Sequence, residues 1–275
     1  NDKRQYAVLR LVQLMCQGEP YGVDRLGSEA NAAAITGEAL WERYQALLSG
    51  ARVELYFSGS APFERVEAAF RSALAGLKGR TVAPVSICRN TLSGGEEKPR
   101  NFEDALDVTQ GKLSMGLRTD IKVTDEEYPA LMLFNAVFGG TTTSKLFLNV
   151  REKLSLCYYA SSQLEKFKGL MLVSSGVEFD KREAAQSEIL AQLEKCRRGE
   201  IEPWELEAAR RSGVNSLKSM LDSQGRMEDF WLGLAVEPGD APEDLAARLE
   251  QVTVDQVAAA ARRVRLDSIY FLKGK

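Results

Sequence analysis

The sequence predicts an α+β protein of two homologous domains, the first truncated at its N-terminal side. An internal repeat is the first observation: residues 35–40, a predicted helix and residues 53–59 parallel residues 252–257, a predicted helix and residues 268–274. The offset is 252 − 35 = 217 at the start and 274 − 59 = 215 at the end. A complete first unit would therefore begin roughly a hundred or more residues before residue 1.

The second observation that predicts an α+β fold is that helical and strand patterns follow one another along the chain. The predicted inward stripes of the helices are Tyr6, Leu9, Val12 and Cys16; Leu40, Trp41, Tyr44, Leu47 and Leu48; Phe63, Val66, Phe70, Ala73 and Leu77; Leu131, Phe134 and Phe138; Ala185, Ile189, Leu193 and Cys196; Leu206, Val214, Leu217 and Leu221; and Met227, Phe230, Trp231 and Leu234. The predicted strands are residues 52–57, 81–88, 106–118, 156–165, 169–177 and 268–272.

Local residue chemistry predicts where these elements start and stop. The predicted helix starts are Thr36, Ser60, Thr124 with Glu127, Asp180 with Glu183, Pro203, and Thr253 with Gln256, and the predicted ends are Gly18, Gly199 and a break near Gly225. Residues 90–100 are rich in Gly, Ser, Glu, Lys and Pro, so we expect a linker there. The predicted domains are thus residues 1–89 and 101–275.

Composition narrows the classes of function. The 275 residues are 44% hydrophobic and 27% charged, which is ordinary for a globular protein. The net charge of −3 comes from interleaved acidic and basic residues, so no basic stripe for a nucleic-acid backbone is expected. No apolar run approaches the roughly 20 residues of a membrane span. We therefore expect a cytoplasmic protein that binds neither nucleic acid nor membrane.

The chain contains no histidine, which excludes Ser-His and Cys-His dyads, histidine bases and His-based zinc sites within it. Its four cysteines, Cys16, Cys88, Cys157 and Cys196, form no Cys-x-x-Cys pair. We expect them to be small buried residues. Carboxylates alone suit calcium or magnesium better than zinc, so we expect no metal site and no catalytic residue within this chain.

The most informative stretch is residues 138–162. Gly139 and Gly140 end a predicted helix, and Ser144 can cap the next one. The stripe of that second helix is Leu146, Phe147, Val150 and Leu154. Arg151 lies near its end and Tyr158 lies on the following strand, 158 − 151 = 7 positions later. A turn between them would aim both side chains at one place.

This stretch resembles the insulinase/pitrilysin family of zinc peptidases, which includes the mitochondrial processing peptidases. The shared pattern is Gly-Gly-x-x-x-Ser-x-Leu-Phe, then Arg-Glu-Lys, then a Tyr seven residues after the Arg. It falls here on Gly139, Gly140, Ser144, Leu146, Phe147, Arg151, Glu152, Lys153 and Tyr158. Residues 110–119 and 268–274 look like the bacterial subunits of the family that lack the metal site. The resemblance covers essentially the whole chain.

The resemblance implies two α+β domains, each an antiparallel sheet covered by helices. It implies that Arg151 and Tyr158 bind the backbone of a peptide substrate near the zinc, with the Gly139, Gly140 and Ser144 loop close by. The family's His-x-x-Glu-His motif cannot be carried over, because its position falls before residue 1. Zinc is thus expected in a partner chain or in the missing upstream region.

Three hypotheses about function follow. The first is a non-catalytic, substrate-binding subunit or half of a zinc-dependent peptidase, which pairs with a zinc-bearing subunit of the same family or with itself. The second is a purely structural homologue. The third is that the full-length protein is itself a zinc metalloendopeptidase with its metal site upstream of this chain.

Simpler interpretations of the same residues also exist. The Gly139–Lys145 loop lacks the strand, the second glycine and the following Ser or Thr of a phosphate-binding loop, so a pair of helix caps is the better interpretation. An Arg near a helix end and a Tyr in a strand are usually structural. The resemblance reverses that preference for Arg151 and Tyr158. Tyr159 should point to the opposite face of the strand and contribute to the core.

Overall fold

The computed structural model describes residues 2–77, 80–82 and 98–275. The described residues fall into two compact units within these bounds: Asn1–Asp24, Cys88–Ser219 and Gly239–Lys275 for unit 1, and Arg25–Ile87 and Met220–Pro238 for unit 2. This division differs from the predicted boundary at residue 89, because residues 2–24 pack with the later part of the chain. Homology between two domains stays a prediction, and most of the predicted linker lies outside the described residues.

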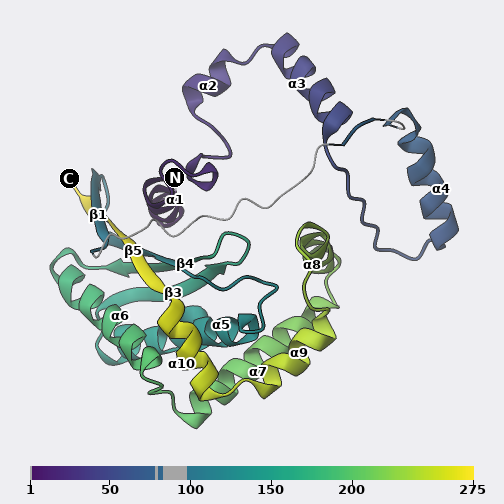
Figure 1. The fold of residues 1–275 in the computed structure, drawn as a ribbon. Helices are drawn as coiled ribbons and strands as arrows, with labels where there is room; N and C mark the ends of the chain where they lie inside the picture. Colours follow the sequence, from purple (N-terminus) through teal and green to yellow (C-terminus); the bar gives the residue numbers. More distant parts are fainter. Residues whose placement is uncertain (1, 78–79, 83–97) are drawn as a thin grey trace. The chain divides into compact units, whose positions relative to one another are not determined.

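Unit 1 contains a five-stranded sheet in the order β1-β5-β2-β4-β3 (Figure 1). Its strands are β1 (Arg100–Leu106), β2 (Gly111–Arg118), β3 (Cys157–Glu165), β4 (Leu170–Val177) and β5 (Arg265–Gly274). The hairpin of β3 and β4 and the last strand are as predicted. The predicted strand 106–118 is confirmed from residue 111 onward and wrong at its start, because residues 107–110 turn the chain between β1 and β2. The sheet is also mixed rather than antiparallel, since β1 runs parallel to β5.

Helix α1 (Lys3–Met15) covers one face of this sheet. Ala7 and Leu11 form a buried cluster with Leu172, Tyr270 and Leu272. The predicted stripe is wrong at its first two positions, because Tyr6 and Leu9 are exposed. The face with the small Ala7 packs inward instead, which lets the helix lie close to the strands.

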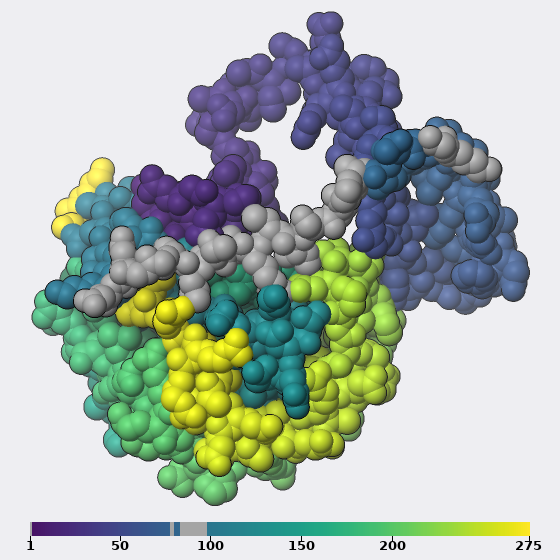
Figure 2. All heavy atoms as spheres, viewed as in Figure 1, coloured from purple at the N-terminus to yellow at the C-terminus, as the bar shows by residue number. Residues whose placement is uncertain are grey.

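The opposite face is covered by α5 (Tyr128–Asn135), α6 (Arg182–Arg197) and α10 (Val254–Arg263). Figure 2 shows α10 in yellow beside α5 and α6, in agreement with their contacts. The predicted α6 stripe is confirmed: Ala185, Ile189, Leu193 and Cys196 are all buried. Two further helices complete unit 1, namely α7 (Pro203–Met220), which starts at the predicted proline, and α9 (Pro242–Gln251).

The observed starts and ends of the helices in unit 1 agree only in part with those predicted from the sequence. The capping box of Thr253 and Gln256 is confirmed, and Gly199 follows α6 with a φ of +76°. The predicted cap at Thr124 is wrong, because α5 begins at Tyr128 without a side-chain cap. The predicted cap at Asp180 is also wrong, because a 3-10 turn, Phe179–Lys181, leads directly into α6. A turn closed by a local backbone hydrogen bond, Tyr128 N–H to the Asp125 carbonyl or Lys181 N–H to the Glu178 carbonyl, precedes each of these two starts.

Unit 2 consists of α2 (Glu29–Ala34), α3 (Gly37–Gly50), α4 (Phe63–Ala73) and α8 (Gln224–Val236). Thr36 caps α3 as predicted, whereas the predicted cap at Ser60 is wrong because α4 starts after Pro62. Residues 52–57 form no strand, since they pair with no strand of the described residues. Of the predicted strand 81–88, residues 83–88 lie outside the described residues. The helix break lies at residues 221–223, before Gly225.

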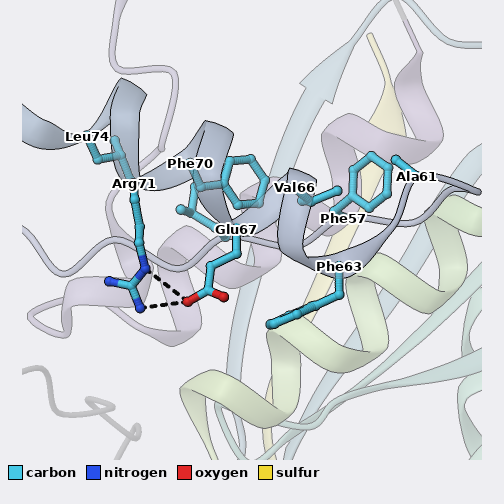
Figure 3. Close-up of a pocket in the computed structure, with 9 residues that line it drawn as sticks. Phe57, Ala61, Phe63, Val66, Glu67, Phe70, Arg71 and Leu74 are labelled. Atoms are coloured by element: carbon cyan, nitrogen blue, oxygen red, sulfur yellow. Dashed lines mark hydrogen bonds and ion pairs between the residues drawn. The ribbon is translucent and has the colours of Figure 1, made fainter.

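Apolar side chains stay exposed in unit 2. Among the described residues, none of its four helices contains a buried residue. Helix α4 and the stretch before it surround an open groove of about 620 Å³, in which the dashed lines of Figure 3 mark the ion pair of Arg71 with Glu67. The other residues that line the groove are Leu55, Phe57, Ala61, Phe63, Val66, Phe70 and Leu74. Such a groove marks a surface that a further polypeptide can cover.

Candidate functional site

The segment before the candidate site is held by close packing. Helix α5 continues into a π-helical turn, Ala136–Gly140, which ends at the predicted glycine pair. A Cβ at Gly139 would lie 2.7 Å from the Ser162 hydroxyl of β3, and one at Gly140 would lie 2.8 Å from the Asn135 amide. The glycines are therefore needed for close approach to β3 and to the preceding turn, and neither has a positive φ.

The loop after the glycines leads into the π-helical segment Leu146–Lys153. The Ser144 hydroxyl accepts a hydrogen bond from the Phe147 N–H at 3.4 Å, as expected of a helix cap. Lys145 forms a buried ion pair with Glu205 of α7, with Nζ 2.7 and 2.9 Å from the two carboxylate oxygens. This ion pair fixes the start of the segment that carries Arg151.

The π-helical turns of the segment Leu146–Lys153 change which of its apolar residues face the core. Leu146 and Val150 are buried as predicted, but Leu154 is exposed. The Leu154 N–H bonds to the carbonyl of Asn149, five residues earlier, and not to the residue four positions back. The extra residue per turn rotates Leu154 away from the core.

Arg151 and Tyr158 line one open pocket of about 450 Å³. Its other lining residues are Glu152, Ser155, Leu156, Cys157, Glu178 and Lys181. The pocket therefore contains two cationic and two anionic side chains beside a phenol. Such a set offers donors and acceptors to a polar ligand.

Tyr158 owes its position to a β-bulge. Cys157 pairs with Val177 and Tyr159 pairs with Gly176, so Tyr158 is the extra residue of β3. Its side chain is exposed to 59%, and its hydroxyl donates a hydrogen bond to the carboxylate of Glu178. This hydrogen bond and the negative charge of Glu178 raise the pKa of Tyr158, so the phenol stays protonated at neutral pH.

Arg151 is less constrained than Tyr158. Its guanidinium lies 4.7 Å from the centre of the Phe147 ring, one turn earlier in the same segment. Its Nε lies 3.5 Å from a carboxylate oxygen of Glu152, and the side chain is 41% exposed. A guanidinium with so weak an ionic contact keeps N–H donors available for a ligand.

Two charged residues of the pocket could not be predicted from the sequence. Glu178 and Lys181 come from the connection between β4 and α6, and Lys181 donates a hydrogen bond to the Ser155 carbonyl at 3.2 Å. No local pattern marks either residue, because a charged residue in a surface turn is commonplace. Only the fold brings them to Tyr158.

The other polar and thiol groups nearby do not suggest catalysis. Burial raises the pKa of the Cys157 thiol to about 11, so it is not a thiolate at neutral pH. Cys16 and Cys196 are buried as predicted, and Cys88 lies outside the described residues. Tyr159 is half-buried, and the Arg4 guanidinium lies 4.1 Å from the centre of its ring.

The side chains that the structure describes do not fit zinc. In the described part of the chain, no group of three His, Cys, Asp or Glu side chains is placed to hold a metal ion. The same residues include no helix that is long and apolar enough to cross a membrane.

Comparisons with known proteins identify the family. The model of the peptidase M16 inactive domain matches residues 34–212. A protein of Bacillus subtilis (strain 168), described as the probable inactive metalloprotease YmfF, is 36% identical over 275 residues, which are all of this chain and 64% of that protein. This chain thus spans less than two thirds of that relative's length.

Solved structures show the same fold. A conserved protein from Enterococcus faecalis V583 superposes with a TM-score of 0.89 at 30% identity, over 100% of this chain and 64% of that one. A peptidase M16 inactive domain from Pseudomonas fluorescens gives a TM-score of 0.75 at 19% identity, over 99% and 66% of the two chains. The α+β fold class and the resemblance seen in the central stretch are thus confirmed. The chain belongs to the peptidase M16 family, and its residues 34–212 match the inactive domain of that family.

Proposed function

We propose that this chain is the substrate-binding, non-catalytic part of an M16 peptidase, in which Arg151 and Tyr158 bind a peptide. The observation that carries the proposal is that both side chains line one open pocket, although a helix end and a bulged strand present them. The match to the inactive domain of the family supports a role without catalysis within the chain. Zinc chemistry is assigned to a partner chain or to a region before residue 1.

The chemistry of the pair suits a peptide backbone. Arg151 has N–H donors for a carbonyl oxygen, and among the described residues its one ion pair is the weak contact with Glu152. The Tyr158 hydroxyl can interact either with the ground-state peptide or with the oxyanion that forms during attack by water. Backbone contacts of this kind do not depend on the substrate's side chains, so the pair supports binding of peptides of varied sequence.

The experiment is to reconstitute the full-length protein with a zinc-bearing M16 partner and to compare Arg151→Ala and Tyr158→Phe with wild type. If the hydroxyl acts on the oxyanion, kcat should fall by about 10²- to 10³-fold, as for loss of an oxyanion-hole donor. If it binds only the ground state, KM should rise while kcat stays unchanged. Arg198→Ala and Tyr6→Phe are matched controls at exposed positions outside the pocket. Unchanged kcat/KM in both pocket variants would contradict the proposal.

We further propose that unit 2 supplies the surface for the rest of the peptidase. Its exposed apolar residues and the groove beside α4 would be covered either by the partner or by a second copy of the chain. A cytoplasmic heterodimer is the expected assembly. Sedimentation of the purified chain, followed by capture of a partner that carries His-x-x-Glu-His, tests this directly. A monodisperse monomer that captures no such partner would favour the purely structural alternative.

The third alternative, in which the whole protein carries its own zinc site, depends on sequence outside this chain. The match to a probable inactive metalloprotease supports a whole protein without such a site. Metal analysis of the full-length protein distinguishes the two, because stoichiometric zinc would contradict the non-catalytic assignment.

A further inference from the structure

The connection between β4 and α6 contacts the Tyr158 segment at two points. Glu178 accepts the hydrogen of the Tyr158 hydroxyl, and Lys181 donates to the Ser155 carbonyl at 3.2 Å. Glu178 precedes and Lys181 ends a short 3-10 turn, Phe179–Lys181, in which the Lys181 N–H bonds back to the Glu178 carbonyl at 3.1 Å. One turn thus contacts the segment both before and at the tyrosine.

The segment that receives these contacts is irregular. Ser155 has a φ of +47°, a backbone conformation that is unfavourable for a residue other than glycine. Three residues later, Tyr158 is the unpaired residue of the bulge in β3. Neither a regular helix nor a regular strand therefore fixes the tyrosine, and contacts from elsewhere must do so.

We propose that Glu178 and Lys181 are positioning residues that fix Tyr158 for peptide binding, and that Glu178 makes the phenol oxygen a hydrogen-bond acceptor. A hydroxyl has one hydrogen and two lone pairs. With its hydrogen bonded to Glu178, Tyr158 presents its lone pairs to the pocket, where they can accept a peptide N–H. Arg151 supplies the donors for a peptide carbonyl. The pair would then bind both polar groups of an extended peptide backbone.

This inference rests on the proposed function. It also decides between the two actions considered there for the Tyr158 hydroxyl, on the oxyanion or on the ground-state peptide. A phenol that donates its one hydrogen bond to a carboxylate cannot at the same time donate to an oxyanion. Tyr158→Phe should therefore raise KM and leave kcat unchanged. The other charged groups of the pocket do not compete for the hydroxyl: Arg151 contacts Phe147 and Glu152, and Lys181 contacts the Ser155 carbonyl.

The test uses the full 275-residue chain and fluorescein-labelled oxidised insulin B chain as an unstructured peptide probe, with binding measured by fluorescence anisotropy. Tyr158→Phe and Glu178→Ala should each weaken binding by about threefold to tenfold, the usual range for one net hydrogen bond. The double variant should bind no more weakly than either single variant, because the two residues act as one unit. Glu183→Ala is the matched control, since it removes a nearby exposed glutamate. Additive losses, or tighter binding by Glu178→Ala, would overturn the inference.

A second measurement does not depend on peptide binding. The ultraviolet titration of wild type minus that of Tyr158→Phe isolates the ionisation of Tyr158. Its pKa should lie above the ordinary value of about 10 and should return toward it in Glu178→Gln. A peptide that fails to bind the wild type would count against the proposed function alone. An unshifted titration in wild type would overturn the role of Glu178, whatever the binding result. Circular dichroism of each variant confirms folding.

Discussion

Unit 1 and unit 2 contain helices of similar length, yet among the described residues only those of unit 1 form a core. In unit 1, helices and strands bury large side chains such as Leu11, Phe134 and Tyr270. In unit 2, helices α3, α4 and α8 form with good local signals, including the Thr36 cap, but contain no buried residue among those described. The difference shows that local sequence suffices to specify a helix, whereas a stable domain needs a second surface against which the helix packs.

The two units also differ in how deeply their ion pairs are buried. Lys145 and Glu205 of unit 1 are each only 7% exposed and contact each other directly. Arg118 is buried too, and its guanidinium bonds to Asp267, Glu19 and the Met15 carbonyl, which joins the end of α1 to the sheet. Two ion pairs in the described part of unit 2, Arg52 with Glu54 and Arg71 with Glu67, lie at the surface by contrast. We expect buried pairs to be costly to break and surface pairs to matter little.

The largest expected contrast is in hydrogen exchange. Amides of β2 and β5 should exchange only on global unfolding, whereas those of α3 and α4 should exchange through local opening, at rates at least about a thousandfold faster. Exchange mass spectrometry of the full chain at low and high concentration measures this. Equal protection at low concentration would show that unit 2 has a core of its own. Protection that appears only at high concentration would indicate a second copy on the apolar surface.

Next in size is the loss of the buried ion pair. Lys145→Met should destabilise unit 1 by about 3–5 kcal/mol, because it leaves the Glu205 carboxylate buried and unpaired. The surface control in unit 2, Arg71→Met, breaks the pair with Glu67 and should cost less than about 1 kcal/mol. Urea unfolding gives both values. If the double variant Lys145→Met, Glu205→Gln is no more stable than Lys145→Met alone, the burial of an unpaired Glu205 charge is not the cause of the lost stability.

A core substitution sharpens the same comparison. Leu11→Ala removes a fully buried side chain between α1 and the sheet and should cost about 2–5 kcal/mol. Leu47→Ala removes an exposed side chain of the same size in α3 and should change the stability by less than about 0.5 kcal/mol. Thermal unfolding followed by near-ultraviolet circular dichroism reports both. A comparable loss for Leu47→Ala would mean that the surface of unit 2 is covered in solution.

The smallest effect expected is the response of unit 1 to acid. Burial opposes ionisation of Asp267, but hydrogen bonds from Ser268, Arg118 and Arg100 outweigh it and lower the pKa of this carboxyl. A lowered pKa in the folded state means that Asp267 stabilises the fold above the unfolded-state value of about 3.9. That contribution should be lost as the pH falls below this value toward the folded-state pKa. Urea unfolding between pH 2 and 6 (about the span of carboxyl titration) should show it. If the free energy of unfolding depends on pH in Asp267→Asn as it does in wild type, other carboxylates cause the acid response.

The candidate site was predictable in part. Arg151 and Tyr158 could be named because the motif around them is local, running from one helix into the next strand. The roles of Gly139 and Gly140 were not predictable, because the groups that exclude a side chain there belong to Ser162 and Asn135. Glu178 and Lys181 were missed for a similar reason: they reach the pocket from a turn that precedes another helix.

The sequence by itself determined the elements whose signals are local: the α6 stripe, the Thr253 capping box, the hairpin of β3 and β4, and the family motif. The tertiary structure decided what depends on distant partners. It chose which face of α1 is buried, placed β1 parallel to β5, and left residues 52–57 without a strand partner among the described residues. The physical reason is that caps and periodicity act within a few residues, whereas burial, strand pairing and the pocket around Tyr158 depend on residues that only the folded chain brings together.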